Sequence, residues 1–468
     1  MRRSTVALVA CPLAGCMLGP NYHRPTVEAP PAYRYEMAEA RDTVNTAWWL
    51  QFQDPVLDGL IAEALAHNLS VQIAAANVEQ AAAVLTQAKA PLYPQASYGA
   101  EGTKQRGSET GATPVPSYVP NPQTSYQVLA GASWEIDLWG RIRRLSEAAR
   151  AQMLATEEAR RGVVLSLVAS VANGYLQLRA FDEQLVIATR TKEAYAESVR
   201  LFELQFQHGL KSRMTVEQAR TQYETAAAVV PQVEAQIAQT ENALSILLGR
   251  NPGPIPRGRP VDALVLPEVP AGVPSQVLER RPDVRQAEQK LVAANAQIGA
   301  AKALYFPTIS LTGAYGTASA DLDNLFKGPS RIWSYAGSVV GPIFTGGAIR
   351  AGVRQAEAAR KAAELGYVAA IQSAFADVDD ALVSRQKLAE QLAAQGRLVV
   401  AAREYARLAR LQFDGGVAPY MTVLQAQQAL FPAELNEVQT RASLFASTVN
   451  VYKAMGGGWV GEAEKLAP

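Results

Sequence analysis

The sixteen residues LQFQHGLKSRMTVEQA (204–219) return later in the chain as LQFDGGVAPYMTVLQA (411–426). Nine of the sixteen positions are identical, at an offset of 207 residues. A second pair, AKAPLYPQAS (88–97) and AKALYFPTIS (301–310), repeats at an offset of 213 residues. This period is far longer than the roughly 20–50 residues of a solenoid unit, so the pattern predicts a duplicated half.

Each half reads as a helix, two strands, a very long helix, a turn and a further long helix. The first half spans residues 54–248, and we expect its strands at about 92–104 and 124–137 and its long helices at about 139–207 and 212–248. The second half spans 281–455, with strands at about 306–318 and 331–344 and long helices at about 347–413 and 419–455. A linker (249–280) joins the halves, and a tail (456–468) follows them.

The long helices are predicted from apolar residues that recur at steps of three and four, as in a coiled coil or an antiparallel bundle. In the first half these residues are Val164, Leu167, Val171, Tyr175, Leu178, Phe181 and Leu185. At roughly 1.5 Å per residue, a helix over 139–207 is about 100 Å long. Pro231 and Pro432 fall inside the returning helices, where we expect kinks.

The strands are predicted from the alternation of apolar with small or polar residues, which is typical of membrane barrels. In 126–136 the apolar positions are Tyr126, Val128, Ala130, Ala132, Trp134 and Ile136, and the second half repeats this parity at Trp333, Tyr335, Gly337, Val339 and Ile343. Four strands cannot close a barrel, because the smallest barrels have eight. The chain must therefore oligomerise to cover its sheet edges, with eight strands from two copies or twelve from three.

The beginning of the chain resembles a bacterial lipoprotein signal. Arg2 and Arg3 precede a short apolar stretch, and Leu13-Ala14-Gly15-Cys16 resembles a lipobox. The resemblance implies that residues 1–15 are removed as a signal peptide and that Cys16 carries a diacylglycerol and an N-acyl chain at the start of a lipidated segment (16–53). The alternative is an unmodified cysteine in an apolar leader. Met17 after the cysteine favours outer-membrane sorting.

Charge and composition exclude several functions. The chain has 44 Lys and Arg against 43 Asp and Glu, and without Arg2 and Arg3 the balance is −1, so no basic surface for nucleic acid is expected. The sequence contains no run of about 18 apolar residues, so it predicts no membrane-spanning helix. The three histidines (His23, His67, His208) are far apart and no catalytic motif is present, which argues against an enzyme and a metal site. A lipid-anchored periplasmic scaffold would leave the four alternating segments without a purpose.

Several motifs resemble the outer-membrane factor (TolC-like) family, in its lipoprotein, NodT-type branch serving resistance-nodulation-division multidrug pumps. They are CMLGPNYHRP (16–25), WWLQFQDP (48–55), ERRPDV (279–284) and PIFTGG (342–347). The resemblance implies a trimer that forms a mixed fold: a twelve-stranded membrane β-barrel above an α-helical barrel, a coiled-coil tunnel in the periplasm. It also implies a lipid-anchored outer-membrane location in a Gram-negative bacterium, with no enzymatic activity and no cofactor beyond the acyl chains.

The partners that the resemblance implies are the other copies of the chain, a periplasmic adaptor protein, an inner-membrane pump and outer-membrane lipid. The channel is then a passive exit duct for drugs and other small molecules. The alternative cargoes are metal ions, or proteins in type I secretion, because the sequence does not identify the cargo.

The repeated turns would be the periplasmic tips that contact the adaptor. Their residues are His208, Gly209, Leu210, Lys211, Gly415, Gly416, Val417 and Ala418, and the alternative is a pair of ordinary interhelical turns. Relatives often carry Asp and Arg at the aperture just after the second tip, whereas this chain has Met421, Gln425 and Gln428. Arg213, Glu217 and Arg220 on the first tip could compensate. Asp377, Asp379 and Asp380 either line the lumen or form a solvated helix face.

Overall fold

The computed structural model of the chain describes residues 17–27, 32–35, 47–269, 279–457 and 459–461. The predicted signal peptide (1–15) and the predicted lipidation site Cys16 lie outside these residues. The chain forms two compact units, and each takes segments from both halves of the sequence. The first unit comprises residues up to 25, 78–155 and 287–367, and the second comprises 26–77, 156–286 and 368 onward.

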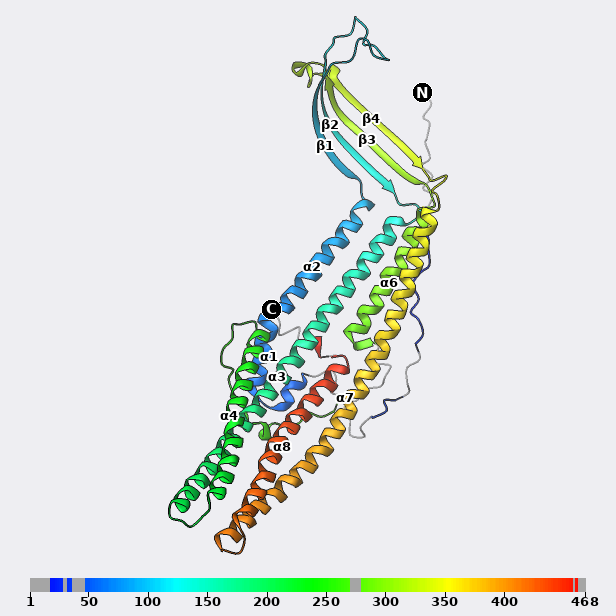
Figure 1. The fold of residues 1–468 in the computed structure, drawn as a ribbon. Coiled ribbons are helices and arrows are strands. Elements are labelled where there is room, and N and C mark those ends of the chain that lie inside the picture. The colour runs from blue at the N-terminus through cyan, green and yellow to red at the C-terminus, as the bar shows by residue number, and fades with distance from the viewer. Residues whose placement is uncertain (1–16, 28–31, 36–46, 270–278, 458, 462–468) are drawn as a thin grey trace. The chain divides into compact units, whose positions relative to one another are not determined.

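Helices make up most of the described chain (Figure 1). The α-helices are α1 (Pro55–His67), α2 (Leu69–Lys89), α3 (Arg141–Gln207), α4 (Arg213–Leu247), α6 (Pro282–Ala303), α7 (Ala348–Asp414) and α8 (Tyr420–Ala454). Short 3-10 helices are η1 (Trp48–Phe52), η2 (Ala90–Leu92), η3 (Val261–Ala263), η4 (Leu322–Asn324) and η5 (Gly328–Ser330).

The four long helices begin and end within two residues of the predicted bounds. Helices α3 and α7 have 67 residues each, and α4 and α8 have 35 residues each. Both α4 and α8 continue through their internal prolines, Pro231 and Pro432. The equal lengths agree with the sequence repeat, whose two copies lie 207 residues apart.

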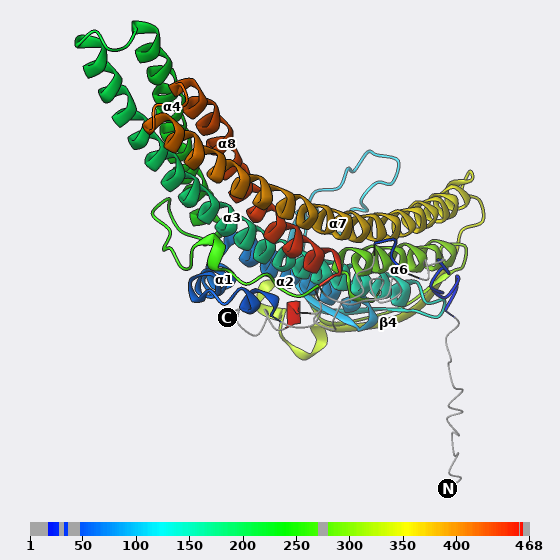
Figure 2. The ribbon, with the colours of Figure 1, turned by 90° about the horizontal axis from the view of Figure 1, so that it is seen from below.

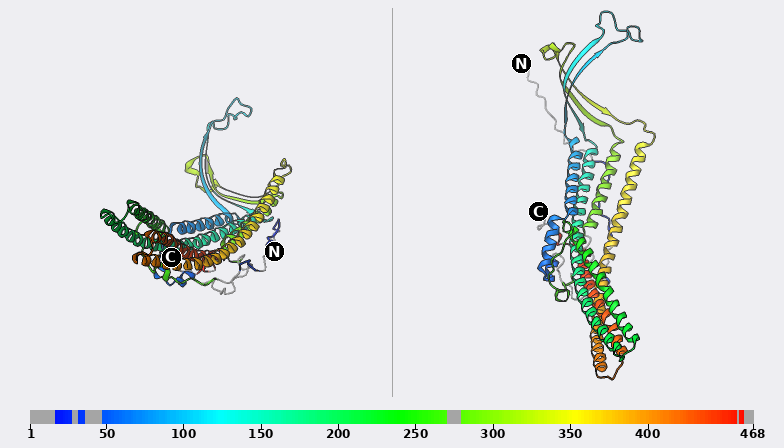
Figure 3. Two further views of the ribbon diagram at one scale, coloured as in Figure 1. Left: turned by 60° about the horizontal axis from the view of Figure 1, so that its bottom comes forward. Right: turned by 60° about the vertical axis from the view of Figure 1, so that its left-hand side comes forward.

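A four-stranded antiparallel sheet in the first unit has the order β1-β2-β3-β4 and is strongly curved (Figure 3). Its strands are β1 (Gln95–Gln105), β2 (Gln123–Ile136), β3 (Thr308–Ser319) and β4 (Arg331–Val340). Within the described part of the chain, β1 and β4 have no partner on their outer edges. The first half of the chain contributes β1 and β2, and the second half contributes β3 and β4.

The register of the sheet gives it one apolar and one polar face. Residues paired directly across the strands share a face, as in Tyr98 with Ala130 and Ala130 with Tyr315. This face carries the apolar positions that the sequence predicts in both halves, including Trp333 opposite Tyr315. The other face carries mainly Ser, Thr, Gln, Gly and Ala, as expected for a strand with two different environments.

Two strand boundaries differ from the predicted ones. The first strand begins at Gln95 rather than near 92, because Ala90–Leu92 form a 3-10 turn and Pro94 has no N–H to donate. The fourth strand ends at Val340 rather than 344, since Pro342 likewise cannot donate to the ladder. Ile343, which the parity argument includes, therefore lies beyond the strand and is fully exposed.

The second unit has a large aromatic core. Trp48 stacks on Tyr452 with ring centroids 5.5 Å apart and meets Trp459 edge to face at 6.0 Å. Helix α3 also contains a window long and apolar enough to cross a membrane by composition, although the sequence shows no continuous apolar run. Because 67% of that window is buried inside the fold, it is a core segment of the bundle.

Candidate functional site: the two interhelical tips

The α3–α4 turn is closed by a glycine in the left-handed region. The Gly209 N–H donates to the Phe206 carbonyl (2.9 Å), and the Leu210 N–H donates to the Gln205 carbonyl (2.8 Å). Gly209 has φ of +70°. This pair of bonds is the Schellman motif, which satisfies the last carbonyls of a helix and needs a residue that tolerates positive φ.

The α7–α8 turn repeats this geometry. The Gly416 N–H donates to the Phe413 carbonyl (3.0 Å), and the Val417 N–H donates to the Gln412 carbonyl (2.9 Å). Gly416 has φ of +72°. Each of these residues follows its counterpart in the first turn by 207 positions, and both predicted turn glycines therefore end a helix in the same way.

Three aromatic rings join the two hairpins just above the turns. Phe202 of α3 lies 4.1 Å from Tyr420 of α8 and 6.3 Å from Phe413 of α7, measured between ring centroids. The same apolar cluster includes Val216, Ala219, Ala409, Val423, Leu424 and Ala426. The ends of α3, α4, α7 and α8 near the turns consequently pack side by side, as the green and orange helices at the upper left of Figure 2 show.

The ends of both turns present apolar side chains to solvent. Leu210 is 72% exposed and Val417 is 82% exposed. The Lys211 ammonium lies 5.9 Å from the Phe413 ring centroid, within the range of a cation–π interaction between the tips. Of the other predicted tip residues, His208 and Gly415 are exposed and Ala418 is half-buried. Each turn therefore ends in an apolar side chain that is exposed to solvent.

The charged residues of the first tip pair with one another. Arg220 donates to Glu203 (2.6 Å) and lies 3.7 Å from Glu217, which is also 3.6 Å from Arg213. Arg213, Glu217 and Arg220, which the sequence suggested as substitutes for a charged aperture, therefore form ion pairs with neighbours on α3 and α4. All of them are exposed, so each pair contributes little to stability.

The predicted aperture residues share one exposed face of α8. Met421, Gln425 and Gln428 follow each other at steps of four and three, and all three are exposed. The opposite face of the same helix carries Val423 and Leu424, which are buried in the tip cluster. The exposed face is therefore free of charge in its first two turns.

A buried carboxylate links three of the long helices above the tips. Glu434 of α8 is 5% exposed and accepts hydrogen bonds from Arg190 of α3 (2.8 Å) and Arg403 of α7 (2.9 Å). Next to it, burial first and then the nearby charges raise the pKa of Tyr195 to about 12. Sequence reasoning missed this group, because its members are far apart in the chain and only packing brings them together.

Comparison with known proteins identifies this architecture. The family model described as "Outer membrane efflux protein" matches residues 60–250 and 273–457. The chain belongs to the outer membrane efflux protein family. It is therefore an outer-membrane efflux channel of Gram-negative type, a passive conduit and not an enzyme.

Individual efflux channels resemble the chain over nearly its whole length. It is 37% identical to "Probable efflux pump outer membrane protein TtgC" of Pseudomonas putida, over 99% of this chain and 97% of that protein. It is 36% identical to "Cation efflux system protein CusC" of Escherichia coli, over 96% and 97% of the two chains. The open-state MtrE channel of Neisseria gonorrhoeae matches with a TM-score of 0.87 and 33% identity, over 95% and 99%.

The family motif at the beginning of the chain forms a strap, residues 17–25, on the first unit. Arg144 of α3 is 1% exposed and donates to the Leu18 carbonyl (3.0 Å), the Gly19 carbonyl (3.3 Å) and Asn21 (2.9 Å). A Cβ atom at Gly19 would lie 2.4 Å from the Cα of Gly299. The strap thus requires glycine where it crosses α6.

The end of the strap is fixed by Glu288 of α6. The Tyr22 hydroxyl donates to this carboxylate (3.0 Å), and Arg24 donates to both of its oxygens, at 2.7 and 2.5 Å. Burial and the neighbouring carboxylate raise the pKa of Tyr22, which keeps the phenol protonated as a donor. These contacts explain why the motif has tyrosine and arginine two residues apart.

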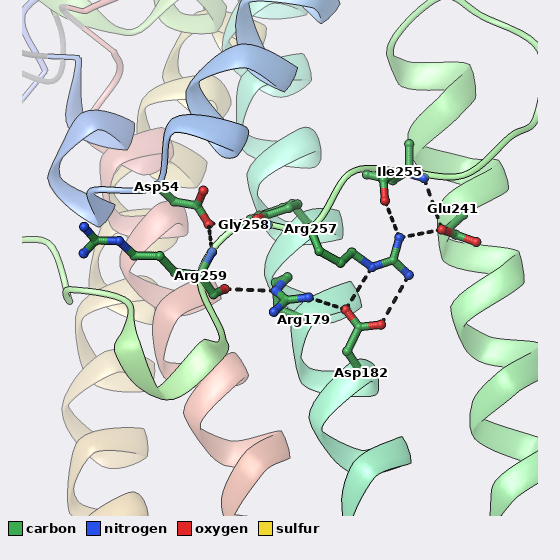
Figure 4. Close-up of polar contacts among 9 residues, drawn as sticks. Asp54, Arg179, Asp182, Glu241, Ile255, Arg257, Gly258 and Arg259 are labelled. Atoms are coloured by element: carbon green, nitrogen blue, oxygen red, sulfur yellow. Dashed lines mark hydrogen bonds and ion pairs between the residues drawn. The ribbon is translucent and has the colours of Figure 1, made fainter.

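The WWLQFQDP motif ends in a fully buried aspartate. Asp54 accepts hydrogen bonds from the Val56 N–H (2.9 Å), the Tyr175 hydroxyl (2.7 Å) and the Arg259 N–H (3.1 Å), the last shown in Figure 4. The first of these bonds caps α1. A Cβ atom at Gly258 would lie 2.1 Å from the Asp54 carboxylate, so the linker approaches closely because it has glycine there.

The same linker is held by a second carboxylate pair in Figure 4. Arg257 donates to Asp182 of α3 (3.0 Å) and Glu241 of α4 (2.5 Å), while the Ile255 N–H donates to Glu241 (3.1 Å). Burial alone would raise the pKa of Glu241, but the hydrogen bonds from Arg257 and Ile255 outweigh it and hold that pKa below its usual value. The linker is therefore bound to both helices of the first hairpin.

The acidic residues of α7 lie beside the ERRPDV motif. Arg281 donates to Asp283 (2.6 Å) and to Asp377 (2.7 Å), and the Arg34 N–H donates to Asp379 (3.0 Å). Asp377 and Asp379 thus make hydrogen bonds within the protein, so this part of α7 is more than a solvated helix face. Asp380 is exposed and lines a cavity with Ser384 and Lys453. Among the described residues, no group of three His, Cys, Asp or Glu could hold a metal ion.

Proposed function

We propose that the chain is the trimeric, lipid-anchored exit channel of a tripartite multidrug efflux pump. The observation that carries the proposal is the four-stranded sheet, which has one apolar face, one polar face and two unpaired edges. Pairing β4 of one copy with β1 of the next satisfies both edges, and three copies give twelve strands. In this arrangement the halves form an internal structural repeat, and the long helices form a periplasmic tunnel.

The tips are the proposed contact with the periplasmic adaptor, which connects the channel to an inner-membrane pump of the resistance-nodulation-division class. The exposed apolar residues Leu210 and Val417 support this assignment. Met421, Gln425 and Gln428 form the proposed aperture, and an uncharged ring there predicts weak selectivity between cations and anions. Cys16 carries the acyl chains that hold the protein in the outer membrane.

Small amphiphilic molecules are the proposed cargo. Relatives include "Toluene efflux pump outer membrane protein TtgC" and "Antibiotic efflux pump outer membrane protein ArpC" of Pseudomonas putida, whereas CusC serves cations. With seven Met and three His in 468 residues, the chain offers few soft ligands for a metal path. Metal export is therefore the second candidate.

The proposal is tested by deleting the gene and measuring susceptibility to antibiotics, solvents, dyes and metal salts. The complementing genes are wild type, Cys16→Ala and the tip variants Leu210→Asp and Val417→Asp. Leu322→Asp is the control, because Leu322 is also a largely exposed apolar residue but lies in the β3–β4 loop. We expect wild type and the control to restore resistance to unrelated amphiphiles, and the tip variants to fail although they still form conducting trimers. Sensitivity to one metal salt alone would instead assign the channel to metal export.

A further inference from the structure

The four strands contain four charged side chains, and these are segregated by face. Lys104 pairs with Thr124 and Arg331 with Thr317, which places both cations on the apolar face. Glu101 pairs with Gln127 and lies on the polar face. Glu135 pairs with Ser310 and lies on the polar face as well. The apolar face therefore carries positive charge and no negative charge.

Both cations lie at the same end of the sheet. Lys104 is the last residue but one of β1, and Arg331 is the first residue of β4. At this end the strands are joined by the loops 106–122 and 320–330, whereas the other ends of β2 and β4 lead to α3 and α7. Both side chains are exposed, and neither has a hydrogen bond or an ion pair with any residue that the structure describes.

On the same face, aromatic residues lie next to each cation, on the side toward the middle of the sheet. Tyr126 pairs with Gly102, and Trp333 pairs with Tyr315. Each of these pairs is two residues inward of the neighbouring cation, or about 7 Å along a strand. The face thus passes from apolar residues to aromatic rings to cations. This order matches the passage from hydrocarbon through the interface to the headgroups of a bilayer.

We propose that Lys104 and Arg331 bind the phosphate groups of the phosphorylated glycolipid in the outer leaflet of the outer membrane. This inference rests on the proposed function, in which the apolar face contacts lipid and the loop end of the sheet faces the exterior. Arginine can hold a phosphate with two parallel hydrogen bonds, and lysine supplies a compact charge. Because β1 and β4 are the two edges, barrel closure brings Lys104 of one copy and Arg331 of the next onto adjacent strands.

The experiment measures lipid binding to the purified full-length protein by native mass spectrometry. The probes are bisphosphorylated lipid A, dephosphorylated lipid A and phosphatidylglycerol. Since one cation near an anionic membrane surface contributes roughly fivefold, we expect Lys104→Gln/Arg331→Gln to bind bisphosphorylated lipid A about 25-fold more weakly than wild type. Each single variant should lose roughly fivefold. Lys361→Gln/Lys387→Gln on α7 makes the same change in charge and should bind like wild type.

The inference is overturned if the double variant binds bisphosphorylated lipid A as wild type does, or if the dephosphorylated lipid binds equally well. An equal loss of phosphatidylglycerol would also overturn it, since the surface would then recognise any anionic lipid. Conductance in planar bilayers distinguishes failure of the lipid-binding inference from failure of the proposed channel function. Pores from wild type and from the double variant support the proposed channel whatever the lipid result, whereas no pores from wild type would refute the channel itself.

Discussion

Asp54→Ala removes one buried carboxylate that accepts three hydrogen bonds. The lost cap at Val56 costs about 1 kcal/mol. The buried Tyr175 hydroxyl loses its acceptor, at about 1–3 kcal/mol. The Arg259 N–H, whose bond to Asp54 is only partly buried, loses its acceptor at about 1 kcal/mol. We expect local opening of the linker to become easier by about 4 kcal/mol, or roughly a thousandfold in its equilibrium constant.

Hydrogen exchange of the full-length protein measures this opening directly, because backbone amides in the network act as reporters. The Gly258 N–H donates to Tyr175 and the Arg259 N–H donates to Asp54. Their exchange should accelerate strongly in Asp54→Ala, and less in Tyr175→Phe, which leaves the carboxylate with two donors. Asp262→Ala is the control, since Asp262 lies exposed in the same linker and its loss should change stability by less than about 0.5 kcal/mol. Exchange at Gly258 and Arg259 that stayed within threefold of wild type would refute the reasoning.

Further predictions concern the second turn, the strap and the response to acid. Gly416→Ala should cost about 1–2 kcal/mol because its φ is positive, and amide exchange at the turn should rise about tenfold, whereas Gly396→Ala inside α7 should stabilise that helix. Gly299→Ala would place a Cβ atom 2.4 Å from the Leu18 carbonyl, so limited proteolysis should cut the strap faster than in wild type or in Gly396→Ala; equal rates would contradict the contact. Although burial raises the pKa of Asp283, the Arg281 hydrogen bonds lower it below its usual value. The ionised Asp283 therefore stabilises the fold at neutral pH, and this stabilisation is lost as pH falls below about 4. The difference between the thermal unfolding temperatures at pH 7 and pH 3 should be smaller in Asp283→Asn than in wild type.

The helices and strands could be predicted from the sequence because the relevant signals are local and occur twice. The period of α3 and the parity of β2 are weak evidence alone, but each returns at a fixed offset in the second half. Gly209 and Gly416 were predictable as turn residues for the same reason. The strand end near Pro342 was misplaced because the alternation continues past the last hydrogen-bonded residue.

The buried polar groups could not be predicted, because their roles depend on segments far away in the chain. Arg144 stands in the basic run RIRR (141–144) and reads as a surface residue, yet the strap covers it. Glu434 similarly resembles an ordinary residue of an amphipathic helix until two other helices bring Arg190 and Arg403 to it. Asp54 belongs to a motif that the sequence alone shows, but its partners Tyr175 and Arg259 lie more than a hundred residues away.

The unpaired edges of β1 and β4 also constrain how the protein is made. A single chain that entered the membrane alone would expose a row of backbone N–H and C=O groups to hydrocarbon, and each unsatisfied group costs several kcal/mol there. In water the same edges are templates for aggregation. In the proposed trimer, insertion into the membrane would therefore have to be coupled to pairing of β1 with β4 of a neighbouring copy, so that biogenesis would depend on the local concentration of other copies.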